Sequence, residues 1–279
     1  MSRVEQIADN ILVLSDVVPI DGRVSWLAPG AKGFEPFNEY LVLSEDNALL
    51  FETGVAAHGP SLVQSLKEIL GSRRLAIYPS RIELDSIGNL GRILEEIPNT
   101  IVGCANPIEP TRLAHLRDWT TPRAPFTRFL VGSTLAEIGF PQLTVVDPVI
   151  RTLGTSWLWH EHAKVLFSAD FFCNDMLTTE DQSVIRRSGD ALIAPEGLRF
   201  SILQKFDWLE LANKENLLPA WDNLFSRISP DVLAPVHGRV QFGAKLVAGV
   251  LEDYRKALFF FPDSAAASAS GAGQGDISG

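Results

Sequence analysis

The feature that most constrains the fold of this chain is an alternation of short apolar segments with segments of helical periodicity. Apolar runs of strand length occupy residues 11–18, 39–43, 48–51 and 75–78. Apolar residues at helical spacing fall within 59–70, and a second helix is expected over 86–96. Strands that alternate with helices in this way indicate an α/β class.

The second half of the chain repeats this order. Strands are expected within residues 126–149, a hairpin at 157–167 and a short strand at 232–236. Mainly helical patterns fill 179–225, and a last helix is expected over 243–258. The repeated order predicts two β-sheets sandwiched between helices, in one domain over residues 1–262. The stretch 263–279 is mostly Ala, Ser and Gly and is expected to be disordered.

Composition narrows the partners and the compartment. The formal net charge is -10, which argues against nucleic acid as a partner because phosphate backbones need clustered Lys and Arg. No apolar run is long enough for a transmembrane helix, and the first residues lack an apolar signal core, so no membrane association is expected. The two cysteines, Cys104 and Cys173, suit neither a disulfide framework nor a zinc knuckle, and a reducing cytoplasm is the expected location.

The loop at residues 80–90 is the first place where chemistry is expected. It lies between a predicted strand and a predicted helix, and it carries Glu83 and Asp85 at positions i and i+2. Both carboxylates can turn toward a point beyond the carboxyl end of the strand, where ligands usually bind in α/β proteins. Taken alone, the same loop is also consistent with a helix cap flanked by surface acids.

Two further polar residues follow predicted strands. Asp170 comes after the apolar run 165–167, and His237 ends the predicted strand 232–236, just before Gly238. An isolated Asp at a strand end is often a turn residue, and a lone histidine is often a hydrogen-bonded structural residue. The order and spacing of the three places change this interpretation.

Together the three places resemble the metallo-β-lactamase superfamily and, within it, the flavodiiron and oxygen-binding diiron branch. Residues 38–42 (NEYLV) and 50–54 (LFETG) are similar to the Asn-Ser-Tyr-Leu and Ile-Asp-Thr-Gly motifs of that family, and 166–170 (LFSAD) is similar to its Leu-Phe-Ser-Gly-Asp. The resemblance covers roughly residues 5–258. It implies a four-layer αββα sandwich of the metallo-β-lactamase type.

The resemblance also implies a metal site that has lost histidines. Carried over residue by residue, the first metal of the diiron branch would be held by Arg81, Glu83, Arg151 and Asp170. An arginine keeps its proton and offers no lone pair, so it cannot be a ligand. We therefore expect Arg81 and Arg151 to replace the first metal with a buried ion-pair cluster.

The second metal position implied by the resemblance keeps most of its ligand residues. Its four positions fall on Asp85, Ser86, Asp170 and His237, of which only Ser86 is a poor ligand. No metal cofactor is expected, and the alternative is a weak mononuclear site in which Asp85, Asp170 and His237 hold one Fe, Mn or Zn ion.

Three functions remain open on these residues. The favoured one is a ligand-binding, sensory or regulatory role, in which the carboxylate–arginine pocket takes a small molecule, an anion or a protein partner. The alternative is a mononuclear metal-dependent hydrolase or oxidoreductase that uses Asp85, Asp170 and His237. A redox component of the flavodiiron kind, with a redox partner, is the least supported because the dinuclear ligand set is incomplete and no flavodoxin-like segment follows residue 258.

Overall fold

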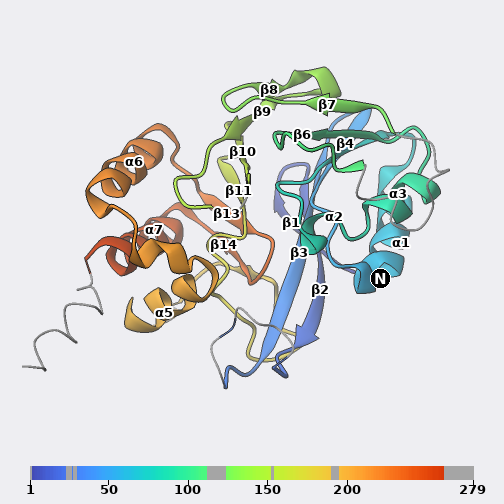
Figure 1. Cartoon of the computed structure of the whole chain (residues 1–279). Helices are drawn as coiled ribbons and strands as arrows, with labels where there is room; N and C mark the ends of the chain where they lie inside the picture. Colours follow the sequence, from blue (N-terminus) through green and yellow to red (C-terminus); the bar gives the residue numbers. More distant parts are fainter. Residues whose placement is uncertain are drawn as a thin grey trace, which may run out of the picture.

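Two β-sheets lie face to face between two layers of helices (Figure 1). The computed structural model describes residues 2–22, 27, 30–111, 124–151, 154–189 and 195–260. Within these residues each sheet has seven strands. The α/β class and the αββα layering expected from the sequence are confirmed. The predicted disordered stretch 263–279 lies outside the described residues.

The first sheet has the strand order β1-β2-β3-β4-β5-β6-β7. Its strands are β1 (Arg3–Ala8), β2 (Ile11–Pro19), β3 (Phe34–Leu43), β4 (Asn47–Phe51), β5 (Arg74–Tyr78), β6 (Ile101–Cys104) and β7 (Phe126–Arg128). The pairs from β1 to β4 are antiparallel, and those from β4 to β7 are parallel. Parallel pairs need crossover connections. These contain η1 (Ala56–His58), α1 (Gly59–Leu70), α2 (Leu84–Ile87) and α3 (Leu90–Glu96).

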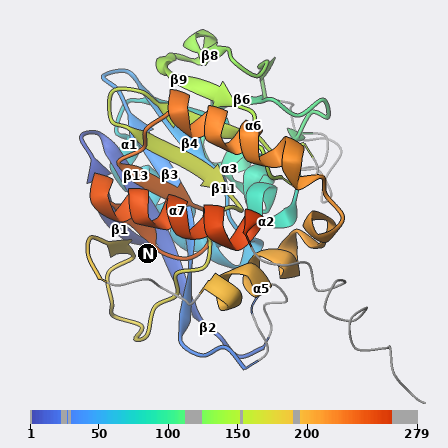
Figure 2. The same cartoon turned by 90° about the vertical axis from the view of Figure 1, so that its left-hand side faces the viewer.

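The second sheet has the order β12-β14-β13-β11-β10-β9-β8. Its strands are β8 (Thr134–Leu135), β9 (Phe140–Val146), β10 (Trp157–His160), β11 (Val165–Ala169), β12 (Ile185–Arg186), β13 (Val232–Pro235) and β14 (Val240–Phe242). Its helices are η2 (Ala136–Ile138), α5 (Pro195–Lys205), η3 (Asp207–Glu210), α6 (Lys214–Arg227) and α7 (Ala244–Phe259). Figure 2 shows α6 and α7 lying across the outer face of this sheet.

Alternation along the strands builds three apolar layers. In β4, Leu49 and Phe51 join the core between the sheets, whereas Leu50 packs toward the helices of the first sheet. In β11, Phe167 faces the same central core and Leu166 faces the helices of the second sheet. Successive strand residues point to opposite faces, so a strand buried on both faces is apolar at every position. That is why these strands have continuous apolar runs.

Several secondary-structure predictions differ from the structure, which also contains the unpredicted strands β1, β6 and β14. The helix expected over 86–96 is divided into α2 and α3. A Cβ on Gly88 would lie 2.6 Å from the carbonyl oxygen of Gly54, and the Asn89 amide donates to the carbonyl oxygens of Thr53 and Val55. The turn after β4 therefore holds the chain at this point. In the segment 179–225, β12 is an unpredicted strand, because two residues paired with β14 leave no periodic signal.

Among the described residues, no helix is both long enough and apolar enough to cross a membrane.

Candidate functional site

All the predicted site residues except Arg151 meet where four strands end. β4 and β5 run parallel in the first sheet, and β11 and β13 run parallel in the second. The carboxyl ends of parallel neighbours lie at one edge of a sheet, which is where ligands bind in α/β folds. Glu52, the loop that begins at Ser80, Asp170 and His237 directly follow these ends. A bridge between Phe37 and His237 ties the two sheets together there.

Arg81 lies at the centre of this cluster with no exposed surface. Its Nη2 is 2.5 Å from Asp170 Oδ1 and also contacts Asp85 Oδ2. Its Nε donates to Glu83 Oε2 at 3.0 Å, and its Nη1 is 3.8 Å from Glu52 Oε1. Burial alone would lower the pKa of the guanidinium, but the four carboxylates outweigh burial and raise that pKa above its usual value. Arg81 therefore stays charged and joins Asp85 to Asp170.

A second cation at Asp170 is a lysine that the sequence did not indicate. Lys205, at the end of α5, has its Nζ 2.8 Å from Asp170 Oδ1. A lysine in the last turn of a helix is common because it complements the helix dipole, so nothing in the local pattern connects Lys205 with a residue 35 positions earlier. Only the packing of α5 beside the end of β11 brings the two side chains together.

His237 is buried against Asp85. Its Nε2 is 2.9 Å from Asp85 Oδ2, and its Nδ1 is 3.8 Å from Glu35 Oε1. The ring of Phe37 meets its ring edge-on, with centroids 4.8 Å apart. Burial raises the pKa of the Asp85 carboxyl, but the hydrogen bond with His237 and the charge of Arg81 together outweigh burial and hold that pKa well below its usual range.

Glu52 is a fully buried carboxylate of the cluster. It adopts a left-handed φ of 68° in the turn after β4. Its Oε1 accepts the backbone N–H of Ser80 at 3.0 Å, and its Oε2 accepts the hydroxyl of Ser86. Burial raises the pKa of Glu52 to about 7, although Arg81 and these hydrogen bonds act against the rise. Ser86, which was a predicted site residue, therefore donates its hydroxyl to Glu52. Glu52 was not among the predicted site residues.

Arg151 does not reach the cluster. Its side chain is 45% exposed and forms an ion pair with Asp147, four residues earlier. The prediction that Arg151 and Arg81 act together is therefore corrected by the geometry. Arg81 and Lys205 already neutralise Asp170, so a third cation would lose its hydration without gaining an unpaired carboxylate. The resemblance to the diiron branch implied a site position for Arg151, but it did not give the direction of the side chain.

Three side chains offer atoms that a metal ion would need. One ligand atom each from Asp85, Asp170 and His237 lies within 4.8 Å of the others. Arg81 Nη2, however, contacts both aspartates, and it holds the position between their oxygens. The cavity that Asp170 and Lys205 line has a volume of about 20 Å³, which is room for about one water molecule.

Cys173 lines the same cavity, but its environment does not favour the reactive thiolate form. It is buried and free of disulfide bonds. Burial raises its pKa to about 12, so the thiol stays protonated at neutral pH.

Solved structures provide the comparison for this arrangement. A metal-soaked flavodiiron core from Synechocystis matches with a TM-score of 0.70 and 19% identity, over 92% of this chain and 60% of its own. The rubredoxin:oxygen oxidoreductase of Desulfovibrio gigas matches with a TM-score of 0.64 and 20% identity, over 91% and 61%. A metallo-β-lactamase from Pontibacter korlensis matches with a TM-score of 0.56 and 16% identity, over 92% and 99%.

The chain has the metallo-β-lactamase fold. It resembles the flavodiiron core, and it spans about 60% of the length of the flavodiiron proteins that it matches. No protein-family model and no curated protein sequence matches it. At these identities the likeness establishes the fold, and the chemistry must be argued from this chain's own residues.

Proposed function

We propose that this chain is a metallo-β-lactamase-fold protein in which Arg81 takes the place of the metal centre and whose role is ligand binding or regulation. The observation that carries the proposal is the contact of Arg81 Nη2 with both Asp85 and Asp170. In a metal site these two carboxylates would share an ion. Here a guanidinium supplies the positive charge through charge-assisted hydrogen bonds.

The site does not fit the dinuclear centre of the diiron branch. A dication about 3 Å from the guanidinium would be repelled by about 10 kcal/mol at an effective dielectric constant of about 20. Arginine cannot relieve this repulsion by releasing its proton. A metal would have to displace Arg81 from Asp85 and Asp170 and leave a buried guanidinium with fewer partners.

The charges of the cluster and the small space beside it disfavour ligand binding inside the cluster. Four carboxylates surround Arg81, and Lys205 is the second cation at Asp170, so an anion would meet more negative than positive groups there. The adjoining cavity of about 20 Å³ is too small for an organic ligand. We propose that the cluster holds the strand ends and loops in place, and that a small molecule or protein partner is recognised elsewhere on the chain. The buried free cysteines support the reducing cytoplasm as its location.

The second candidate is a mononuclear metal-dependent hydrolase or oxidoreductase. The convergence of Asp85, Asp170 and His237 within 4.8 Å favours it. Two carboxylates and an imidazole can bind Fe, Mn or Zn, provided that Arg81 moves aside.

Metal analysis separates the two candidates. Protein purified without chelator is assayed for iron, manganese and zinc by mass spectrometry, and well under one ion per chain is expected. The variant Arg81→His removes the guanidinium and adds an imidazole beside three existing ligands, so it is expected to gain about one zinc ion per chain. Arg255→His, at a half-buried arginine paired with Asp222 on the surface, is the matched control and should gain none.

A protein that binds a metal ion would give a different result. If the unmodified protein carries about one ion per chain and His237→Ala releases it, the metal-dependent enzyme is supported and the replacement by Arg81 is wrong.

A further inference from the structure

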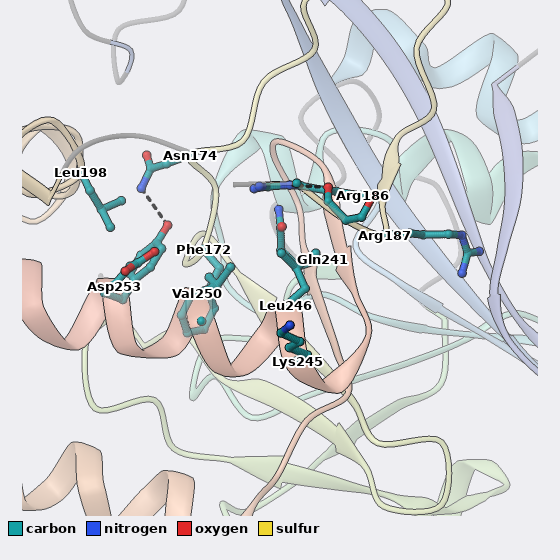
Figure 3. Close-up of a pocket in the computed structure, with 14 residues that line it drawn as sticks. Phe172, Asn174, Arg186, Arg187, Leu198, Gln241, Lys245, Leu246, Val250 and Asp253 are labelled. Carbon is teal, nitrogen blue, oxygen red and sulfur yellow. Dashed lines mark hydrogen bonds between the residues drawn. The ribbon is translucent and has the colours of Figure 1, made fainter. Parts of the chain in front are cut away.

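A cavity of about 340 Å³ lies beside the second sheet, apart from the Arg81 cluster. Residues of α5, α7, β12 and β14 and of two loops line it, and it opens to solvent beside the exposed Lys245 and Gly249 (Figure 3). Phe172, Asn174 and Tyr254 line both this cavity and the small one at Asp170, so they form the wall between them. The Asn174 amide donates to Tyr254 Oη at 2.7 Å and fixes that wall.

One part of the cavity is apolar. Phe172, Leu198, Leu246, Val250 and Tyr254 contribute to its lining. Small-molecule sites are commonly concave, mostly apolar and about 300–1,000 Å³ in volume, and this cavity falls at the lower end of that range. At about 30 Å³ for a group the size of a water molecule, it holds about ten such groups.

The polar end is formed by Arg186 and Gln241. Both side chains are buried and both contact Asp175: Arg186 Nη1 is 3.7 Å from its Oδ2, and Gln241 Nε2 donates to the same oxygen at 3.0 Å. Asp175 is also paired with Arg239 at 2.8 Å. One carboxylate between two guanidinium groups leaves one net positive charge at this end of the cavity.

Gln241 adds a specific acceptor. It is 1% exposed, and its Oε1 accepts no hydrogen bond from the described residues. A buried amide oxygen without a partner is costly, and a ligand that donates to it would remove the cost. Lys245 provides a further positive charge from α7. Arg187 does not, because its guanidinium stacks on Phe242 at 4.0 Å and points away in Figure 3.

We infer that this cavity binds a small monocarboxylate of about ten carbons in all, with an apolar chain and a hydrogen-bond donor next to the carboxylate. The carboxylate pairs with Arg186 and Lys245, the neighbouring donor reaches Gln241 Oε1, and the apolar body lies against Leu198 and Val250. This inference names the ligand class for the binding role proposed above, and in that respect it rests on that proposal.

Gly249 on α7 allows a sharp test. It lines the cavity, and a Cβ placed on it meets no atom within 4 Å. Gly249→Leu therefore fills the cavity without a clash and replaces a glycine inside a helix with a better helix former, so the variant should fold. Ala248→Leu, at an exposed position of the same helix that does not line the cavity, is the matched control.

Binding of 2-hydroxydecanoate to the full chain is measured by isothermal titration, with 2-hydroxydecanamide as the neutral analogue. The carboxylate is expected to bind one per chain and at least about tenfold more tightly than the amide. Gly249→Leu should abolish binding while its melting temperature is maintained, and Ala248→Leu should bind as the unmodified protein does. Lys245→Gln should weaken binding several-fold, whereas Lys256→Gln on the same helix should not.

Equal affinity for the carboxylate and the amide, or unchanged binding by Gly249→Leu, would overturn the inference. Metal content is measured on the same samples, so the two proposals fail separately. Metal-free protein that does not bind 2-hydroxydecanoate overturns only the cavity, and protein that carries a stoichiometric metal yet binds the carboxylate overturns only the replacement by Arg81.

Discussion

At the scale of single residues, Arg81 keeps a full charge without solvent contact because Glu52, Glu83, Asp85 and Asp170 surround it. The arrangement is cooperative in a simple electrostatic sense. Each carboxylate is tolerated in the interior because the guanidinium is there, and the guanidinium is tolerated because the carboxylates are. Removing the cation should therefore cost more than the value of any single ion pair.

We expect Arg81→Met to lower the free energy of unfolding by about 3–5 kcal/mol at pH 8, because buried carboxylates lose their partner. The loss should shrink at pH 5. Burial raises the pKa of Glu52 to about 7, so at pH 5 this carboxyl is protonated and no longer depends on the charge of Arg81. Urea unfolding at the two pH values measures both effects.

The control for this change is Arg255→Met, which breaks an exposed pair with Asp222 and should cost less than about 1 kcal/mol. A loss for Arg81→Met that is as small as that of the control would contradict the central role of Arg81.

Glu52 makes the stability of the unmodified protein depend on pH, and its contribution falls as the pH rises. Burial raises its pKa to about 7 in the folded state, against an ordinary value of 4.5. Below pH 4.5 the carboxyl is protonated in both states and carries no penalty. Between pH 4.5 and 7 the unfolded state releases the proton first, so stability falls by about 3 kcal/mol as pH rises and then levels off.

The isosteric variant Glu52→Gln is neutral at every pH. Its advantage over the unmodified protein in urea unfolding should therefore grow from pH 4.5 to pH 7. Glu68→Gln, at an exposed glutamate of α1, is the control and should show no such trend. A constant difference between Glu52→Gln and the unmodified protein across this range would show that Glu52 is ionised throughout.

At the scale of elements, the division between α2 and α3 keeps the Asp85 loop against the turn after β4. Gly88 permits that approach, because any Cβ there would lie 2.6 Å from Gly54 O and 2.9 Å from the backbone nitrogen of Ala56. Its own φ of -59° is ordinary, so the requirement is for space and not for an unusual backbone conformation.

Gly88→Ala is accordingly expected to destabilise the protein by about 1–3 kcal/mol, as overpacking does, although alanine is the better helix former. Gly249→Ala in α7, where a Cβ meets nothing, should instead stabilise by about 0.5–1 kcal/mol. Thermal unfolding of the two variants compares them directly. The same sign for both changes would mean that close contact at Gly88 does not decide the outcome.

At the scale of the whole molecule, the two sheets come from separate halves of the chain and pack face to face. Ion pairs join them at the edge where their parallel strands end. Asp85 and Arg81 come from the first half, and Asp170, Lys205 and His237 come from the second. In this arrangement the junction depends on charges that the chain itself supplies. Its stability should then be independent of added or removed metal ions.

Treatment with excess EDTA is thus expected to leave the melting temperature unchanged, because a ligand raises stability only where the folded state binds it. Arg81→His loaded with zinc is the comparison and should lose several degrees on the same treatment. A fall in the melting temperature of the unmodified protein with EDTA would indicate a metal that contributes to the fold.

Much of the fold follows from local pattern. The continuous apolar runs predict strands buried on both faces, helical spacing predicts α1 and α7, and their repeated order predicts the two sheets. The positions of Glu83, Asp85, Asp170 and His237 directly after predicted strands also come from the sequence, since parallel strands end at a common edge. These features depend on neighbours within a few residues along the chain.

Only the tertiary structure decided which charges meet. The family resemblance placed Arg151 at the site, yet its side chain pairs with Asp147 at the surface, and Lys205 from α5 lies beside Asp170. Glu52 joined the cluster, and the cavity between α5 and α7 appeared, through packing of elements far apart in the chain. The physical reason is that burying a charge depends on the balance of desolvation and pairing over the whole site, which no local pattern records.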